Sequence, residues 1–210
     1  MSPWLSLLQQ YRAIAVIRYP HINIGLLMAQ AVAAGGIRII EITWNSPQPE
    51  KLVSQLRHQL PECMIGAGTI LNLQQLESAI AAGAKFIFSP HLNTKLIETA
   101  ITANIPVIPG ALTPTEIVTA WEAGATCVKV FPIQAVGGIN YLKNLQSPLG
   151  QIPLIPTGGV TVENAPDFIQ AGAVAVALGG NLFPKQLVTT GNWQGITQRA
   201  KQLQGKLFQF

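Results

Sequence analysis

The sequence predicts a (β/α)8 barrel of the TIM type with a short N-terminal helix, and it places residues 1–210 in a single domain. Strand-like and helical segments alternate along the chain, and the strands are short and apolar, as is typical of parallel strands covered by helices. Small-residue turns such as AAGGIRII at 33–40 and QAGAVAVAL at 170–178 lead from a helix end into a strand. Eight such units within 210 residues indicate one compact barrel.

The elements follow in order along the chain. MSPWLSLLQQYR lacks the basic and apolar regions of a signal peptide, and it predicts a short amphipathic helix in a cytoplasmic protein. The expected strands are AIAVIR at 13–18, RIIEIT at 38–43, MIGAG at 64–68, FIFS at 86–89, PVIPG at 106–110, CVKVFP at 127–132, PLIPTGG at 153–159 and AVALGG at 175–180. The apolar spacing predicts helices over 23–34, 48–60, 72–82, 93–103, 114–123, 138–146, 162–171 and 185–204. A doubly wound open sheet is the alternative fold.

The composition narrows the class of function. Only 10% of the residues are charged, but no apolar run approaches the roughly 18 residues of a membrane span, so we expect no membrane partner. The net charge of +4 comes from scattered lysines and arginines, which argues against nucleic acid and suits an anionic substrate. Cys63 and Cys127 lack metal-type spacing, as do the histidines, so we expect reduced core thiols and no metal.

Lys129 and Glu41 are charged residues inside otherwise apolar strand segments. Strand alternation puts Lys129 on the face opposite to its neighbouring valines, and Glu41 on the face opposite to its neighbouring isoleucines. If the valines and isoleucines face the helices, both charged side chains point into the barrel. The active site of this fold lies where the C-terminal ends of the strands converge. Both side chains lie near those ends, so we expect them to face one cavity.

A buried lysine and a buried carboxyl in one cavity permit covalent chemistry. Burial favours the neutral form of each group, whereas close ion pairing favours the charged forms. An uncharged amine attacks a ketone and forms a Schiff base, and the resulting iminium accepts electrons when a carbon–carbon bond breaks. A nearby carboxyl can carry protons at each step. The alternative for Lys129 and Glu41 is a buried salt bridge that only orders the core.

Two further residues at strand ends are candidates for binding a substrate carboxylate. Arg18 closes the first strand, and its guanidinium can hold a carboxylate with two hydrogen bonds. Thr69 follows GAG at the end of the third strand and can add a hydroxyl or a backbone N–H. The alternative for Arg18 is a surface guanidinium at the start of a loop.

Two glycine pairs lie between a strand end and a helix start, in PTGGV at 156–160 and in LGGN at 178–181. Bare backbone amides at such places bind anions, and loops after the seventh and eighth strands hold phosphate in many barrels. A single glycine pair is also common in tight turns, so the prediction of a phosphate site depends on the presence of both pairs. Asn181 caps the last helix or contacts the anion directly.

The motifs EITWNSP, IGAGTI, FIFSPHL, PVIPGALTPTE, VKVFP and PTGGV, in this order, resemble those of the class I 2-keto-3-deoxy-6-phosphogluconate (KDPG) aldolases, which also act as 4-hydroxy-2-oxoglutarate (KHG) aldolases. The resemblance implies that Lys129 forms the Schiff base and that Glu41 accepts the C4 hydroxyl proton, yielding pyruvate and glyceraldehyde 3-phosphate. It implies homotrimers that need no metal or organic cofactor. The residues implied to line the pyruvate end are Thr69, Pro90 and Phe131, and those implied to hold the phosphate are Gly158, Gly159, Gly179 and Gly180.

The chain departs from the family pattern at two places. Asn45 stands where some members have a carboxylate-binding arginine, which leaves that task to Arg18. NSPQ resembles the relatives specific for the galactonate epimer, and Asn181 replaces a serine common in the gluconate enzymes. The sequence therefore leaves open a gluconate, galactonate or hydroxyglutarate substrate. A phosphate-binding barrel without covalent chemistry, such as an isomerase or a thiamine-phosphate-synthase-like enzyme, and a phospho-sugar sensor are the remaining alternatives.

Overall fold

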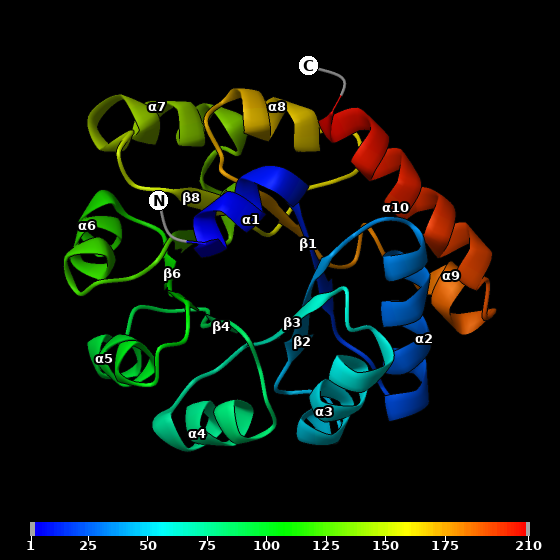
Figure 1. Cartoon of the computed structure of the whole chain (residues 1–210). Helices are drawn as coiled ribbons and strands as arrows, with labels where there is room; N and C mark the ends of the chain where they lie inside the picture. Colours follow the sequence, from blue (N-terminus) through cyan, green and yellow to red (C-terminus); the bar gives the residue numbers. More distant parts are fainter. Residues whose placement is uncertain (1–2, 209–210) are drawn as a thin grey trace.

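Strands and helices alternate along the chain in a computed structural model, which describes residues 3–208 (Figure 1). The helices are α1 (Pro3–Tyr11), α2 (Ile22–Ala34), α3 (Pro49–Gln59), α4 (Leu73–Ala81), α5 (Thr94–Thr102), α6 (Pro114–Glu122), α7 (Ile139–Leu149), α8 (Ala165–Gln170), α9 (Lys185–Thr189) and α10 (Trp193–Leu207), with the 3-10 helix η1 (Ile133–Val136) before α7. The strands are β1 (Ala13–Ile17), β2 (Ile39–Thr43), β3 (Met64–Gly68), β4 (Ile87–Phe88), β5 (Val107–Ile108), β6 (Gly110–Ala111), β7 (Val128–Val130), β8 (Leu154–Pro156) and β9 (Val176–Leu178).

Every paired strand is parallel to its neighbour within the described part of the chain. One sheet has the order β5-β4-β3-β2-β1-β9, and the other has the order β6-β7-β8. An isolated parallel bridge joins Thr157, after β8, to Ala177 in β9. Helices lie around the outside of the strands (Figure 1). The architecture is therefore an α/β fold with a curled parallel sheet, and it resembles a TIM barrel.

Side chains alternate across the strands as the sequence predicts. The outward residues of β2, Ile40 and Ile42, belong to the apolar cluster between the strands and the helices. The inward residues form a second cluster, which α1 closes from one end. Trp4 of α1 packs against Phe86 with the two rings tilted by 34° and their centroids 4.8 Å apart. The interior cluster consists of Trp4, Leu8, Ile14, Ile39, Phe86, Phe88, Ile108, Cys127, Ile155, Ala175 and Ala177. Because α1 fills the end where the strands begin, the opposite end is left for a cavity.

Three elements differ from the sequence prediction, each for a local reason. The strand expected at 106–110 is divided at Pro109, since β5 pairs with β4 whereas β6 pairs with β7. Helix α8 begins at Ala165 rather than at 162, because Thr161 and Asn164 exchange hydrogen bonds between side chain and backbone. The helix expected at 185–204 is two helices, α9 and α10, since Gly191 between them has a φ of +67°.

Among residues 3–208, no helix is both long enough and apolar enough to cross a membrane.

Candidate active site

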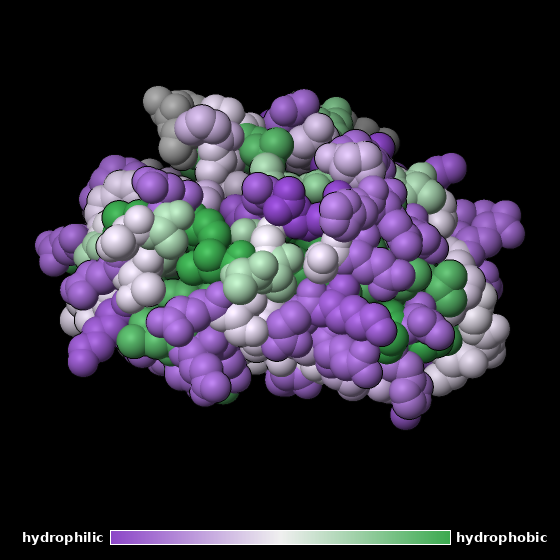
Figure 2. Space-filling model, turned by 60° about the horizontal axis from the view of Figure 1, so that its bottom comes forward, coloured by the Kyte–Doolittle hydropathy of each residue, from purple (hydrophilic) through white to green (hydrophobic). Residues whose placement is uncertain are grey.

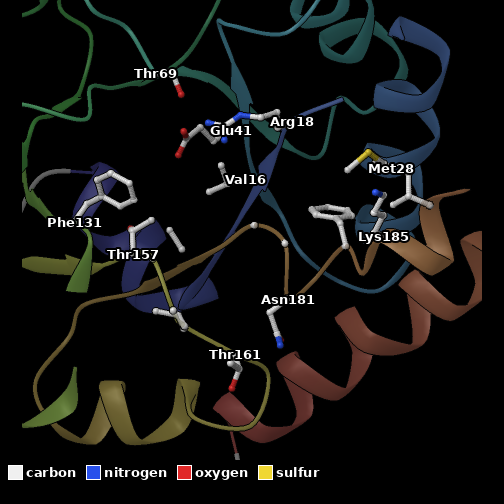
Figure 3. Close-up of a pocket in the computed structure, with 18 of the residues that line it drawn as sticks. Val16, Arg18, Met28, Glu41, Thr69, Phe131, Thr157, Thr161, Asn181 and Lys185 are labelled. Carbon is white, nitrogen blue, oxygen red and sulfur yellow. The ribbon is translucent and has the colours of Figure 1, made fainter. Parts of the chain in front are cut away.

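A cavity of about 850 Å³ opens at the C-terminal ends of the strands. It contains every residue that the sequence predicts for the site, brought together from seven strands and the loops that follow them. Figure 3 shows part of its lining, with Glu41, Arg18 and Thr69 near one another and Asn181 on the opposite side. The predicted residues that line it are Arg18, Glu41, Thr69, Pro90, Lys129, Phe131, Gly158, Gly159, Gly179, Gly180 and Asn181.

Lys129 reaches the cavity from the middle residue of β7. It is 6% exposed, while Val128 and Val130 on either side of it pack toward the helices. Its Nζ lies 5.3 Å from the ring centroid of Phe88 and 5.2 Å from that of Phe131. The faces of these two rings pack against the amine, and no hydrogen bond joins it to a carboxylate among the described residues. The amine is thus oriented toward the cavity and free to meet a substrate carbonyl.

Glu41 occupies the third position of β2 and is fully buried. Its carboxyl group fits because Gly68 of β3 has no side chain, since an added Cβ there would overlap the carboxyl group. Neither carboxyl oxygen has a hydrogen-bond partner among the described residues. Burial raises the pKa of Glu41, while the positive charges of Lys129 and Arg18 act in the opposite direction without cancelling that rise. A carboxyl group with a raised pKa holds its proton to a higher pH than a free glutamate does, so it is suited both to take up and to release a proton.

Arg18 and Thr69 lie on the Glu41 side of the cavity (Figure 3). Arg18 follows β1 directly, and its exposed side chain lines the cavity, where it can reach a substrate at the rim. Thr69 follows β3 and has a φ of +58°, an unfavourable conformation for a β-branched residue. Strain of this kind persists where the surrounding structure imposes it, and it is frequent at functional sites. Thr69 thus has an unfavourable backbone conformation at a position in the cavity wall.

In the loops after β8 and β9, the backbone N–H groups of Gly159, Val160, Gly180 and Asn181 donate to no protein acceptor within residues 3–208. All four residues line the cavity. Gly158 and Gly159 have φ values of +84° and +94°, which only glycine adopts easily. Successive bare N–H groups in such loops form an anion-binding concavity. The sequence analysis expects these amides at helix starts. They belong instead to the loops, because α8 begins at Ala165 and α9 begins at Lys185.

The carboxamide of Asn181 does not cap the following helix. Its Oδ1 accepts hydrogen bonds from the N–H of Val162 at 2.9 Å and from Arg199 Nη2 at 3.1 Å. The residue at the N-cap of α9 is Pro184. Of the two roles considered for Asn181, helix capping is therefore wrong, and its backbone N–H and Nδ2 remain as groups that can face an anion.

Several cavity residues were not predicted from the sequence. Val16 and Ala177 form part of the floor, and both are inward residues of strands, so alternation could have identified them. Met28 and Lys185 come from α2 and α9, and they extend the cavity away from Glu41 (Figure 3). No strand pattern marks these two, because their positions depend on how the helices pack.

Comparison with known proteins agrees with this geometry. The family model of the KDPG and KHG aldolases matches residues 5–199. A 2-dehydro-3-deoxy-phosphogluconate aldolase of Dickeya dadantii is 34% identical over 83% of this chain and 82% of the relative. The KHG/KDPG aldolase of Escherichia coli is 32% identical over 94% of this chain and 92% of the relative. A crystal structure of KDPG aldolase from Legionella pneumophila, with pyruvate captured as a covalent carbinolamine, superimposes with a TM-score of 0.89 at 29% identity over 96% of this chain and 98% of that one. The chain belongs to the KDPG and KHG aldolase family.

Proposed function

We propose that this chain is a class I aldolase that cleaves 2-keto-3-deoxy-6-phosphogluconate to pyruvate and glyceraldehyde 3-phosphate, and 4-hydroxy-2-oxoglutarate to pyruvate and glyoxylate. The observation that carries the proposal is a lysine and a fully buried, unpartnered carboxyl that share one cavity with an anion-binding loop pair. Family membership and the carbinolamine of the Legionella relative support it.

The proposed reaction begins at Lys129. Its uncharged amine attacks the C2 carbonyl of the substrate, and the resulting carbinolamine loses water to give an iminium. The carboxylate of Glu41 then removes the proton from the C4 hydroxyl, the C3–C4 bond breaks, and its electron pair neutralises the iminium as an enamine. The aldehyde leaves, Glu41 returns its proton to C3, and water hydrolyses the iminium to release pyruvate and the amine. One carboxyl group thus balances the protons of both half-reactions.

The cavity divides into two ends in this proposal. The pyruvate end consists of Lys129, Glu41, Arg18, Thr69, Pro90 and Phe131, where Arg18 and Thr69 bind the substrate carboxylate while the proline and the phenylalanine exclude water. The phosphate end consists of Gly158, Gly159, Gly179, Gly180 and Asn181, whose loops present the four unpaired N–H groups. A substrate with a carboxylate at one end and a phosphate at the other matches this division.

We also infer that the two sheets act as one closed barrel of eight strands. The first and last strands, β1 and β9, pair with each other, and β5 continues through Pro109 into β6. The bridge between Thr157 and Ala177 supports closure on the remaining side. Glu41 on β2 and Lys129 on β7 must keep a fixed separation if they act on one substrate. A closed ring of strands would hold β2 and β7 in that arrangement.

We further infer a cytoplasmic homotrimer. Large apolar side chains remain exposed at Leu71, Leu73, Ile101 and Trp121, and Figure 2 shows apolar areas that interrupt a mostly hydrophilic face. Exposed apolar areas mark contacts between subunits when they are contiguous. The free thiols of Cys63 and Cys127 agree with a reducing compartment. Light scattering of the purified chain tests this inference, since a monomer mass would contradict it.

The test of the proposed function is a pyruvate-release assay coupled to lactate dehydrogenase. Three substrates are compared under one condition: the phosphogluconate-derived keto acid, its C4 epimer from galactonate, and 4-hydroxy-2-oxoglutarate. We expect pyruvate from the first, and the relative kcat/KM values will define the stereochemical preference that the sequence leaves open. Absence of pyruvate from all three would refute the proposal.

A further inference from the structure

Arg199 lies outside the cavity lining, but it binds directly to a residue of the phosphate end. From α10 it donates Nε to the backbone oxygen of Asn181 at 3.0 Å and Nη2 to Asn181 Oδ1 at 3.1 Å. A guanidinium with two parallel donors fixes both the position and the orientation of the group that it holds. Arg199 therefore fastens the loop after β9 to α10 through a single residue. In Figure 3 the side chain of Asn181 extends from its loop toward this helix.

The same carboxamide also ties the two phosphate loops to each other. Asn181 Oδ1 accepts the N–H of Val162, which belongs to the loop after β8. Thr161 and Asn164 brace that loop further by donating backbone N–H groups to each other's side chains at 2.7 and 3.0 Å. A chain of hydrogen bonds thus runs from Arg199 through Asn181 to the loop that carries Gly159.

The unpaired N–H groups lie on both sides of this connection. Gly159 and Val160 precede Val162 by a few residues, while Gly180 and Asn181 belong to the other loop. An anion binds well only if such donors keep a fixed separation before it arrives, because ordering them on binding would reduce affinity. Arg199 forms no ion pair with a carboxylate among the described residues, and both of its hydrogen bonds go to Asn181.

We propose that Arg199 is a positioning residue that gives this aldolase its selectivity for phosphorylated substrates, acting through Asn181 on the spacing of the two phosphate loops. The inference rests on the proposed function and deepens it. Arg199 has no part in the bond-breaking steps, which take place at Lys129 and Glu41. Its removal is therefore expected to change KM and not kcat. A guanidinium that merely secured α10 would leave the ratio between phosphorylated and unphosphorylated substrates unchanged.

The test is the Arg199→Gln variant, assayed with 2-keto-3-deoxy-6-phosphogluconate and with the same keto acid lacking the phosphate. We expect KM for the phosphorylated substrate to rise about tenfold or more, the loss typical of a hydrogen bond to a charged group. The inhibition constant of inorganic phosphate should rise with it. We expect kcat to stay constant, as should kcat/KM for the unphosphorylated substrate. Equal changes for both substrates, or no change for either, would overturn the inference.

Arg57→Gln is the matched control. Arg57 also donates to a loop carbonyl, that of Gly83 at 3.0 Å, but it does not line the cavity. Its substitution removes the same charge and should leave the substrate ratio unchanged. If Arg199→Gln fails to fold, Arg199→Lys applies the same criterion, since lysine keeps the charge but cannot bond both oxygens in the same geometry.

A double-mutant cycle tests the route through Asn181. Asn181→Ala removes the Oδ1 acceptor, so adding Arg199→Gln to it should raise KM by far less than Arg199→Gln does alone. Fully additive effects would contradict this route. Trapping of pyruvate on the wild-type chain by borohydride tests the proposed aldolase function separately from the role of Arg199. Without an adduct the proposed function fails, whereas an adduct together with an unselective Arg199→Gln refutes only the role of Arg199.

Discussion

The two ends of the cavity present their chemistry in different ways. At the pyruvate end, Lys129 and Glu41 are side chains on strands, where pairing with both neighbours fixes the backbone. At the phosphate end, backbone N–H groups lie in loops, and the side-chain oxygens of Asn181 and Asn164 hold those loops in place by accepting hydrogen bonds from Val162 and Thr161. Covalent chemistry needs one amine and one carboxyl at a set depth, which a strand supplies. Phosphate binding needs several donors around a volume, which a loop supplies.

The difference predicts that substitutions at the pyruvate end abolish turnover, whereas those at the phosphate end alter substrate preference. Lys129→Arg is expected to show the largest effect. A guanidinium stays charged and cannot form an imine, so we expect no measurable pyruvate release. Lys143→Arg, on the exposed face of α7, is the control and should retain full activity. Turnover by Lys129→Arg would show that the amine is not the nucleophile.

Glu41→Gln should reduce kcat by about 10² to 10⁴, the span usual for removed acid–base catalysis. The amide has nearly the shape of the carboxyl group but can neither accept the C4 hydroxyl proton nor donate one to C3. Schiff-base formation with pyruvate should continue, and borohydride trapping measures it independently of turnover. Wild-type kcat in this variant would contradict the assignment of Glu41 as the proton carrier.

Glycine substitutions test whether the loops of the phosphate end require the backbone conformation that glycine adopts. Gly159→Ala puts a side chain on a residue with a φ of +94°, where its Cβ would overlap Gln134. We expect a loss of about 1–2 kcal/mol in the free energy of unfolding and a rise in KM for the phosphorylated substrate alone. Gly180→Ala is the control for stability, since nothing lies within 4 Å of the added Cβ. Denaturant unfolding that gives equal losses for both would refute this account of the loops.

These outcomes depend on features that the sequence predicts unequally. Alternation in β2 and β7 is sufficient to place Glu41 and Lys129 inward, because a strand residue has only two faces to choose from. Gly158 and Gly159 mark a loop for a similar reason, since both have a positive φ that few other residues tolerate. The contact between Arg199 and Asn181 joins residues 18 positions apart, and it exists only once α10 packs beside the loops. Gly191 divides the last helix in two, and periodicity alone does not reveal this break.

The raised pKa of Glu41 predicts a pH-dependent difference in stability. The pKa in the folded chain lies above its ordinary value of 4.5, so the folded state disfavours ionisation. The contribution of Glu41 to the free energy of unfolding is fully present below pH 4.5. It is lost as the pH rises from there through the pKa of Glu41 in the folded chain. Glu41→Gln has no such loss, and its Tm relative to the wild type should increase as the pH rises above 4.5. A difference in Tm that does not vary with pH would show that burial does not raise this pKa.

The smallest effect is expected at Thr69. Its φ of +58° costs a β-branched residue about 1–2 kcal/mol, whereas glycine at the same place would cost about 0.5–1 kcal/mol of unfolded-chain entropy. Thr69→Gly should therefore stabilise the chain by roughly 0.5–1 kcal/mol, by the difference of these terms, while it weakens binding of the substrate carboxylate. Chemical denaturation measures the first effect, and KM measures the second. A destabilised variant would show that Thr69 is not strained.

The proposed mechanism depends on Lys129 as the nucleophile of a pyruvate-forming aldolase. The most direct measurement incubates the wild-type chain with pyruvate and borohydride and locates the adduct by peptide mass spectrometry. Lys185 also lines the cavity, so the experiment distinguishes two lysines that a substrate could reach. We expect a single pyruvate-derived adduct per chain, on Lys129. An adduct on Lys185, or none at all, would contradict it.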